Sequence, residues 1–154
     1  MSRHSEIAER LFREEQYNCA QAVFTAFCDV TGLDQETARR IASSFGGGLG
    51  RLREVCGALS GAAMVAGCLW GGYDVTVPEE KKEHYARIQH LAERFREENG
   101  DIICRKLLEL SETEPTDPTP EPRTPAYYAG RKCADFVRVA AEVMDELIEE
   151  RARG

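Results

Sequence analysis

The sequence predicts an all-α fold: a compact helical bundle of about six or seven helices with one proline-rich loop. Apolar residues recur at helical spacing, and no segment of useful length alternates as a strand would. Helix start and stop residues flank these periodic segments. Five of the six prolines gather in one stretch, Ser111–Pro125. At 154 residues the chain is most simply one helical domain, 1–154.

Capping residues mark the helices of the N-terminal half. Asn18 is a good N-cap, with Gln21 three residues on in the capping-box position. Asp34 caps the next helix, and the run of glycines after Phe45 ends it. These signals predict helices over Ser2–Glu15, from Asn18 to about Val30, over Gln35–Phe45, and from about Arg53 to Trp70.

The C-terminal half begins with Pro78, which suits the first turn of a long polar helix ending at Asn99. Asp101 is expected to cap a short helix through Leu110. The proline-rich segment, residues 111–125, must then be an extended surface connection. The final helix is expected from about Ala129 to Arg151. The buried stripes of the two long helices are expected to be Tyr85, Ile88, Ala92 and Phe95, and Phe136, Val137, Ala140, Met144 and Leu147.

Composition excludes several classes of function. A net charge of −7 argues against nucleic acid as a partner, because a phosphate backbone needs a basic face. The charged N-terminus has no apolar stretch of the secretory kind, which predicts a cytoplasmic protein. In that reducing compartment static disulfides are uncommon, so the six cysteines are expected to be free thiols, metal ligands or redox-active residues.

The uncharged run from Val55 to Tyr73 is long enough on paper to cross a bilayer. Five glycines and a serine weaken its transfer into lipid, and no Lys/Arg cluster flanks one end only. A buried central helix is therefore the favoured interpretation, with no membrane span.

The glycine run before this helix fails the tests for phosphate-binding motifs. Gly50 is followed by Arg51-Leu52 where a P-loop needs Lys-Ser/Thr, and no strand precedes Gly46 as a dinucleotide fingerprint requires. Arg51, Arg53 and the helix N-terminus could still hold an anion. A plain loop between helices is the alternative.

Small residues cover two faces of the following helix. At about 100° per residue, nothing larger than Ala shares the face of Cys56. Such a cleared surface lets a second backbone or a prosthetic group approach the sulfur. Gly57 and Gly61 are thus candidates for binding a cofactor, and tight helix packing is the alternative.

The cysteines contain no Cys-x-x-Cys pair, so any shared site must be assembled from separate elements. Cys28 and Cys68 fall near helix C-termini and are expected to be small core residues. The other four fall near helix N-termini, where the dipole and unpaired N–H groups lower the pKa of a thiol. By helical period these four also point inward: Cys19, Cys56, Cys104 and Cys133.

The order of these cysteines and their neighbours resembles a known family, C_GCAxxG_C_C, whose members are described as redox-active. The resemblance spans roughly Arg10 to Met144 and implies a redox role for the four cysteines, with Cys28 and Cys68 outside the pattern. The matching pieces are Asn18-Cys19-Ala20-Gln21-Ala22-Val23, Gly46-Gly47-Gly48 with Gly50, Cys56-Gly57-Ala58-Leu59-Ser60-Gly61, Cys104 before Leu107-Leu108, and Cys133 before Val137 and Ala140.

Three functions remain open at this level. In a thiol redox protein Cys56 would attack, one of the other three motif cysteines would resolve, and Arg51 or Arg53 would stabilise charge; the partner would be a redox protein or a small thiol or disulfide. Alternatively Cys19, Cys56, Cys104 and Cys133 hold a [2Fe–2S] cluster or a zinc ion. The third alternative is a helical interaction subunit, with a homodimer as one outcome.

Overall fold

The computed structural model describes every residue, Met1–Gly154, and the fold is all-α as predicted. None of its helices combines the length and apolarity needed to cross a membrane. The elements are α1 Arg3–Glu14, α2 Cys19–Ala26, α3 Cys28–Thr31, α4 Gln35–Ala42, the 3-10 helix Ser43–Phe45, α5 Gly57–Trp70, α6 Pro78–Asn99, α7 Cys104–Leu107, α8 Pro125–Gly130 and α9 Cys133–Arg153.

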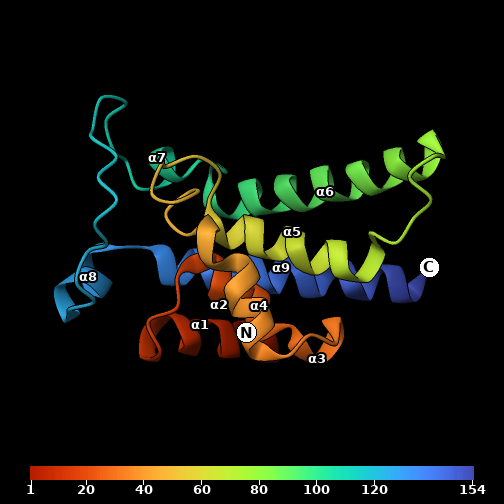
Figure 1. Ribbon diagram of the computed structural model, residues 1–154, viewed down its shortest axis with the longest axis horizontal. Coiled ribbons are helices and arrows are strands. Elements are labelled where there is room, and N and C mark those ends of the chain that lie inside the picture. Colours follow the sequence, from red (N-terminus) through yellow and green to blue (C-terminus); the bar gives the residue numbers. More distant parts are fainter.

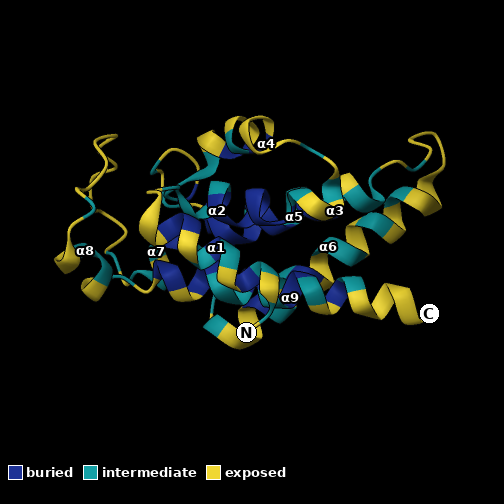
Figure 2. Cartoon of the chain, turned by 90° about the horizontal axis from the view of Figure 1, so that it is seen from below, coloured by how far each residue is buried: buried dark blue, intermediate teal, exposed yellow.

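Three long helices, α5, α6 and α9, run along the long axis of the molecule (Figure 1). Helix α9 packs against α1, α2, α5 and α6, whereas α2 packs against α1, α4, α5 and α9. Burial follows this arrangement: α2, the inner side of α5 and the middle of α9 are buried, and α8 and the proline-rich segment are exposed (Figure 2). The core therefore lies around α2 and α9, at opposite ends of the sequence.

The stripe expected on the last helix is confirmed, since all five of its residues are buried. On α6 the expectation was wrong at Tyr85, whose exposed fraction is 57%. Leu91 and Phe95 are the fully buried residues of this helix. The stripe shifts because α6 packs mainly on α9, and its N-terminal half extends beyond the core.

Several helix boundaries differ from expectation: α7 ends at Leu107 instead of Leu110, and α9 begins at Cys133 instead of about Ala129. Two further differences have clear local reasons. The helix after Asn18 breaks at Phe27, so that α2 and α3 replace one longer helix. Helix α5 begins four residues later than expected, because Arg53 has φ +63° and Val55 forms an isolated antiparallel bridge with Ile103. Both features exclude α-helical backbone there.

Helix α8 was not expected within the proline-rich region. Thr124 accepts a hydrogen bond from the backbone N–H of Tyr127, and Pro125 occupies the first helical position. This is the usual N-terminal signal of a helix, a Thr cap followed by Pro.

His4 on α1 joins this helix to α3 and α9. Its Nδ1 lies 2.7 Å from Oδ1 of Asp145 on α9, and its Nε2 lies 2.9 Å from Oδ1 of Asp29 on α3. The ring stacks on Phe27 with centroids 4.1 Å apart. His4 is thus a structural residue that joins α1 to both neighbours.

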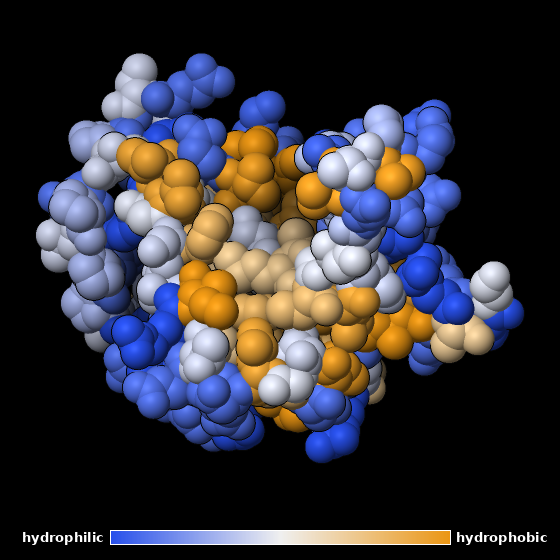
Figure 3. All heavy atoms as spheres, turned by 45° about the vertical axis from the view of Figure 1, so that its right-hand side comes forward, coloured by the Kyte–Doolittle hydropathy of each residue, from blue (hydrophilic) through white to orange (hydrophobic).

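Helix α5 is covered unevenly along its length. Its N-terminal half is buried, but Met64, Gly67 and Trp70 are only partly buried and Cys68 is exposed. The corresponding face of the molecule, with the right-hand end of Figure 1 turned forward, shows apolar residues around a hollow (Figure 3). The two ends of α5 therefore lie in different surroundings.

Candidate functional site

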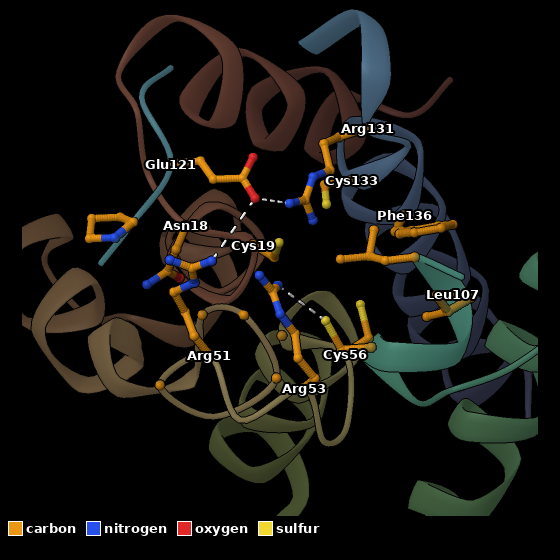
Figure 4. A pocket seen from close by; sticks show the side chains of 18 of the residues that line it. Asn18, Cys19, Arg51, Arg53, Cys56, Leu107, Glu121, Arg131, Cys133 and Phe136 are labelled. Atoms are coloured by element: carbon orange, nitrogen blue, oxygen red, sulfur yellow. Dashed lines mark hydrogen bonds and ion pairs between the residues drawn. The ribbon is translucent and has the colours of Figure 1, made fainter. Parts of the chain in front are cut away.

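A cavity of about 420 Å³ lies beside the first residues of α2, α7 and α9 (Figure 4). Residues 46–51, called the glycine loop below, form another part of its wall. All four motif cysteines line it, whereas Cys28 and Cys68 do not. Cys56, Cys104 and Cys133 are buried, and Cys19 is partly buried. The other residues of interest on its wall are Asn18, the loop glycines, Gly57, Arg51, Arg53, Glu121, Arg123, Tyr127 and Arg131.

Cys19 and Cys133 are each the first residue of a helix. The capping box expected before Cys19 is present: Asn18 Oδ1 accepts from the N–H of Gln21 at 2.9 Å, and Gln21 Oε1 accepts from the N–H of Asn18 at 3.0 Å. Cys133 opens the 21-residue helix α9. Both sulfur atoms therefore lie at the positive end of a helix dipole.

Cys56 and Cys104 are held by the backbone of the isolated bridge. The N–H of Cys56 donates to Ile102 at 2.8 Å, and the N–H of Cys104 donates to Glu54 at 2.6 Å. Cys104 begins α7, but Cys56 is the residue before α5 rather than one turn inside it. This pairing of loop backbones brings the two cysteines together. It could not be predicted from the periodicity of the sequence.

The glycine loop passes close to the sulfur atoms in an unusual backbone conformation. Five successive residues have positive φ, from +64° at Gly47 to +69° at Arg51. At Gly48, φ is +71° and an added Cβ would lie 2.8 Å from the Cβ of Cys104 and 2.6 Å from a backbone nitrogen. Only glycine fits at this position, because both the φ angle and the space exclude a side chain.

Gly57 and Gly61 serve helix packing. A Cβ at Gly61 would lie 2.8 Å from the carbonyl oxygen of Ala20 on α2, and one at Gly57 would lie 2.7 Å from that of Phe45. Gly61 does not line the cavity, and Gly57 does. The close approach of α2 to α5 accounts for both residues and positions Cys19 near Cys56.

The thiols of Cys19 and Cys133 lie close enough to interact, and their pKa values diverge. The interaction with Cys19, together with the cationic side chains of Arg131 and Arg53, lowers the pKa of Cys133 against the opposing effect of burial. The interaction with Cys133, together with burial, raises the pKa of Cys19 well above its ordinary value. Of the pair, Cys133 is the stronger acid.

The other two motif cysteines are held in the protonated form. Burial raises the pKa of Cys56 to about 12, although the N–H groups of Ala58 and Leu59 act in the opposite direction. Burial also raises the pKa of Cys104, against a hydrogen bond from Arg53 whose Nη1 lies 3.7 Å from the sulfur. The N-terminal position of a cysteine therefore does not by itself give a thiolate here.

Sequence reasoning missed the cationic residues that come from the proline-rich region and the segment before α9. Arg123 donates hydrogen bonds to the carbonyls of Phe12 and Tyr17, each at 3.0 Å, and packs over the Phe12 ring at 4.4 Å. Arg131 pairs with Glu121 and lies 5.7 Å from the ring centroid of Tyr127. The sequence carried no periodic signal for these contacts, because they join irregular segments.

Cys68 is exposed, contrary to the expectation of a core residue, whereas Cys28 is partly buried and packs against the core. Both lie toward the end of α5 remote from the cavity. The expected position near a helix C-terminus was wrong for Cys28, which is the first residue of α3 because the preceding helix breaks at Phe27.

The fit of a metal or cluster depends on how the sulfur atoms are grouped. Although four cysteines line one cavity, no three His, Cys, Asp or Glu side chains are grouped closely enough to hold one metal ion. As arranged, the sulfur atoms favour pairwise chemistry, and the [2Fe–2S] and zinc predictions stay open to metal analysis.

Comparison with known proteins agrees with the arrangement of the cysteines. No curated protein and no solved structure matches the chain. The model of one protein family, described as "Putative redox-active protein (C_GCAxxG_C_C)", matches residues 17–147. That span includes all four cavity cysteines, the glycine loop and the proline-rich segment. The chain belongs to the C_GCAxxG_C_C family.

Proposed function

We propose that this protein reduces disulfides by thiol–disulfide exchange, with Cys133 attacking and Cys19 resolving. The observation that carries the proposal is that Cys19 and Cys133 line one cavity together with four arginines, where their pKa values shift in opposite directions. An exchange reaction needs a thiolate and a second thiol within reach of it, and the pair supplies both.

The division of roles follows from the surroundings of each sulfur. Cys133 opens α9, and the neighbouring Cys19 thiol is the largest cause of its lowered pKa, followed by the cations Arg131, Arg53 and Arg123, which favour the thiolate. We therefore assign the attack to Cys133 instead of Cys56, whose pKa is raised to about 12 by burial. In this proposal Cys56 and Cys104 form the wall beside the reacting pair.

The reaction balances in two exchange steps. The Cys133 thiolate attacks one sulfur of the substrate disulfide, forming a mixed disulfide and releasing the other half as a thiolate, which takes up a proton. Cys19 loses its proton and attacks the Cys133 sulfur, closing a Cys19–Cys133 disulfide and releasing the second half. The substrate gains two electrons from the protein pair and two protons, one from Cys19 and one from water. An external thiol reductant restores the dithiol.

A single-turnover experiment tests the proposal. The pre-reduced full chain is mixed with the neutral disulfide of 2-mercaptoethanol, quenched with acid, and mapped by mass spectrometry. We expect one Cys19–Cys133 disulfide per chain, a stable mixed disulfide on Cys133 in Cys19→Ser, and no reaction in Cys133→Ser. The matched control is Cys68→Ser, which removes an exposed cysteine far from the cavity and is expected to react as the parent does.

Two results would contradict the exchange mechanism. One is unchanged turnover in Cys133→Ser. The other is iron or zinc at one equivalent after anaerobic purification, lost on replacement of the cavity cysteines, which would support the cluster alternative. Retention of function and oligomeric state without all four cysteines would support the interaction subunit.

A further inference from the structure

The cysteine cavity is cationic although the protein is acidic. Arg51, Arg53, Arg123 and Arg131 line it, against one carboxylate, Glu121, in a chain of net charge −7. Four guanidinium groups around one hollow concentrate positive potential there and attract anions.

The four arginines differ in their contacts. Arg123 is engaged with backbone carbonyls and aromatic rings, and Arg53 donates to Cys104. Arg51 and Arg131 instead share Glu121: the carboxylate pairs with Arg131 and lies 4.0 Å from Arg51 (Figure 4). These two guanidinium groups already hold a carboxylate at the cavity mouth.

Glu121 belongs to a segment that can withdraw without breaking a helix. It lies in the irregular stretch between α7 and α8, its side chain is 43% exposed, and Pro118 and Pro120 of the same stretch line the cavity. Arg123 anchors the far end of the stretch to the carbonyls of Phe12 and Tyr17. The carboxylate is therefore a replaceable occupant between two fixed cations.

The backbone around Arg51 is strained. Arg51 has φ +69° and Leu49 has φ +70°, a conformation that costs free energy in residues with a side chain. Local strain of this kind persists where surrounding contacts enforce it, and it is concentrated at functional sites.

We propose that the substrate is an anionic low-molecular-weight disulfide, and that Arg51 and Arg131 bind its carboxylate in the place that Glu121 occupies. The inference rests on the exchange function proposed above and adds its substrate class. Glu121 acts as an internal competitor that covers the cavity until the substrate's carboxylate replaces it.

Three small disulfides of different charge test the preference: 3,3′-dithiodipropionate, the neutral disulfide of 2-mercaptoethanol, and cystamine. Each rate with the pre-reduced chain is divided by the rate of the same disulfide with N-acetylcysteinamide, an uncharged reference thiol, which corrects for intrinsic reactivity. We expect the dianion to exceed the neutral compound by about tenfold and the dication by more. Equal corrected rates would overturn the proposal.

Variants assign the preference to residues. Arg51→Gln and Arg131→Gln are expected to lower the dianion-to-neutral ratio severalfold each, and Glu121→Gln to raise it. A ratio is used because loss of Arg131 also affects the pKa of Cys133, which changes both rates alike. Arg153→Gln, at the exposed end of α9, removes the same charge and is expected to leave the ratio unchanged.

Binding of 3,3′-thiodipropionate, a thioether that cannot exchange, separates this proposal from the exchange function. Calorimetry is expected to detect binding to the parent chain, tighter binding to Glu121→Gln, and at least tenfold weaker binding to Arg131→Gln of normal helical content. Binding without exchange would refute the redox role alone. Absence of binding, or equal binding by Arg131→Gln, would refute the anion site.

Discussion

At its N-terminal end α5 adjoins a cavity that gathers four cysteines and four arginines, whereas Cys28 and Cys68 lie toward its other end, where Cys28 is near Asp34 and Asp29. Arg131 and Arg53 help to lower the pKa of Cys133 in the cavity. Burial, followed by Asp34 and Asp29, raises the pKa of Cys28. The difference teaches that burial raises the pKa of a thiol at either end, and that only at Cys133 do the neighbouring thiol and cations reverse this effect.

Selective alkylation is expected to show the largest difference between the two ends of α5, as a difference in the labelling rates of their cysteines. At pH 7 a brief pulse of iodoacetamide is expected to label Cys133 first, ahead of the more exposed Cys68, because the thiolate is the nucleophile. Raising the pKa of Cys56 from 9 to about 12 lowers its thiolate fraction about a thousandfold, so Cys56 is expected to be labelled much more slowly than Cys133. Labelling sites are read by peptide mass spectrometry.

The pH dependence of that labelling has a definite sign. Since the pKa of Cys133 is lowered, its rate levels off at a lower pH than the rate of Cys68, whose pKa burial raises. In urea the differences are expected to disappear, which serves as the control. Labelling of Cys68 before Cys133 in the folded chain would contradict the comparison.

Packing of α5 also differs between its two ends, and two glycine substitutions measure this. Gly61→Ala places a Cβ 2.8 Å from the carbonyl oxygen of Ala20, and we expect it to destabilise the fold by about 1–3 kcal/mol. Gly67→Ala meets nothing within 4 Å and is expected to stabilise it by about 0.4–1 kcal/mol through helix propensity. Urea unfolding followed by circular dichroism gives both values; equal effects would show that α5 is packed alike along its length.

Removal of the anchor of the proline-rich segment is expected to have an intermediate effect. Arg123→Ala loses two hydrogen bonds to carbonyls and the stacking on Phe12, at a cost of about 1.5–3 kcal/mol. Hydrogen exchange should increase over residues 111–124. Arg105→Ala, which loses only exposed bonds to Ser111 and Glu114, is the control and is expected to change stability little.

The smallest expected effect comes from Arg53. Arg53→Gln removes the donor to Cys104 and a cation that lowers the pKa of Cys133, so the pKa of both thiols rises. Alkylation of Cys133 at pH 7 should slow by about two- to fivefold, as expected for one partly screened charge. A faster rate would show that Arg53 restricts access more than it stabilises charge.

Much of the fold could be predicted from local signals. The capping box at Asn18, the cap at Asp34 and Pro78 at the start of α6 act within one turn, and the structure confirms all three helix starts. The cap before α8 was equally local, at Thr124-Pro125, but the surrounding prolines hid it. Tyr85 could not be assigned correctly, because a helical period gives a face and not the neighbour that covers it.

The candidate site, like the fold, could be predicted only where local signals in the sequence determine it. That Cys19 starts a helix follows from the Asn18 cap, whereas the last helix was expected from about Ala129 and begins at Cys133 without a side-chain cap. The family resemblance joined both cysteines to Cys56 and Cys104. The bridge between Val55 and Ile103, the left-handed run at 47–51 and the pairing of Arg131 with Glu121 depend on contacts between irregular segments. Such contacts follow no periodicity and no short motif. The cysteines could therefore be predicted from the sequence, but Arg123 and Arg131, which affect the pKa of Cys133, could not.

The position of α9 in the core has a consequence for synthesis on the ribosome. Helix α1 packs on α9, and α9 supplies Cys133, so neither the packing of α1 nor the cavity can be completed until α9 has been synthesised. During translation the emerging Cys19 has no Cys133 to meet. Docking of α9 thus completes the hydrophobic core and brings these two cysteines to one cavity in the same step.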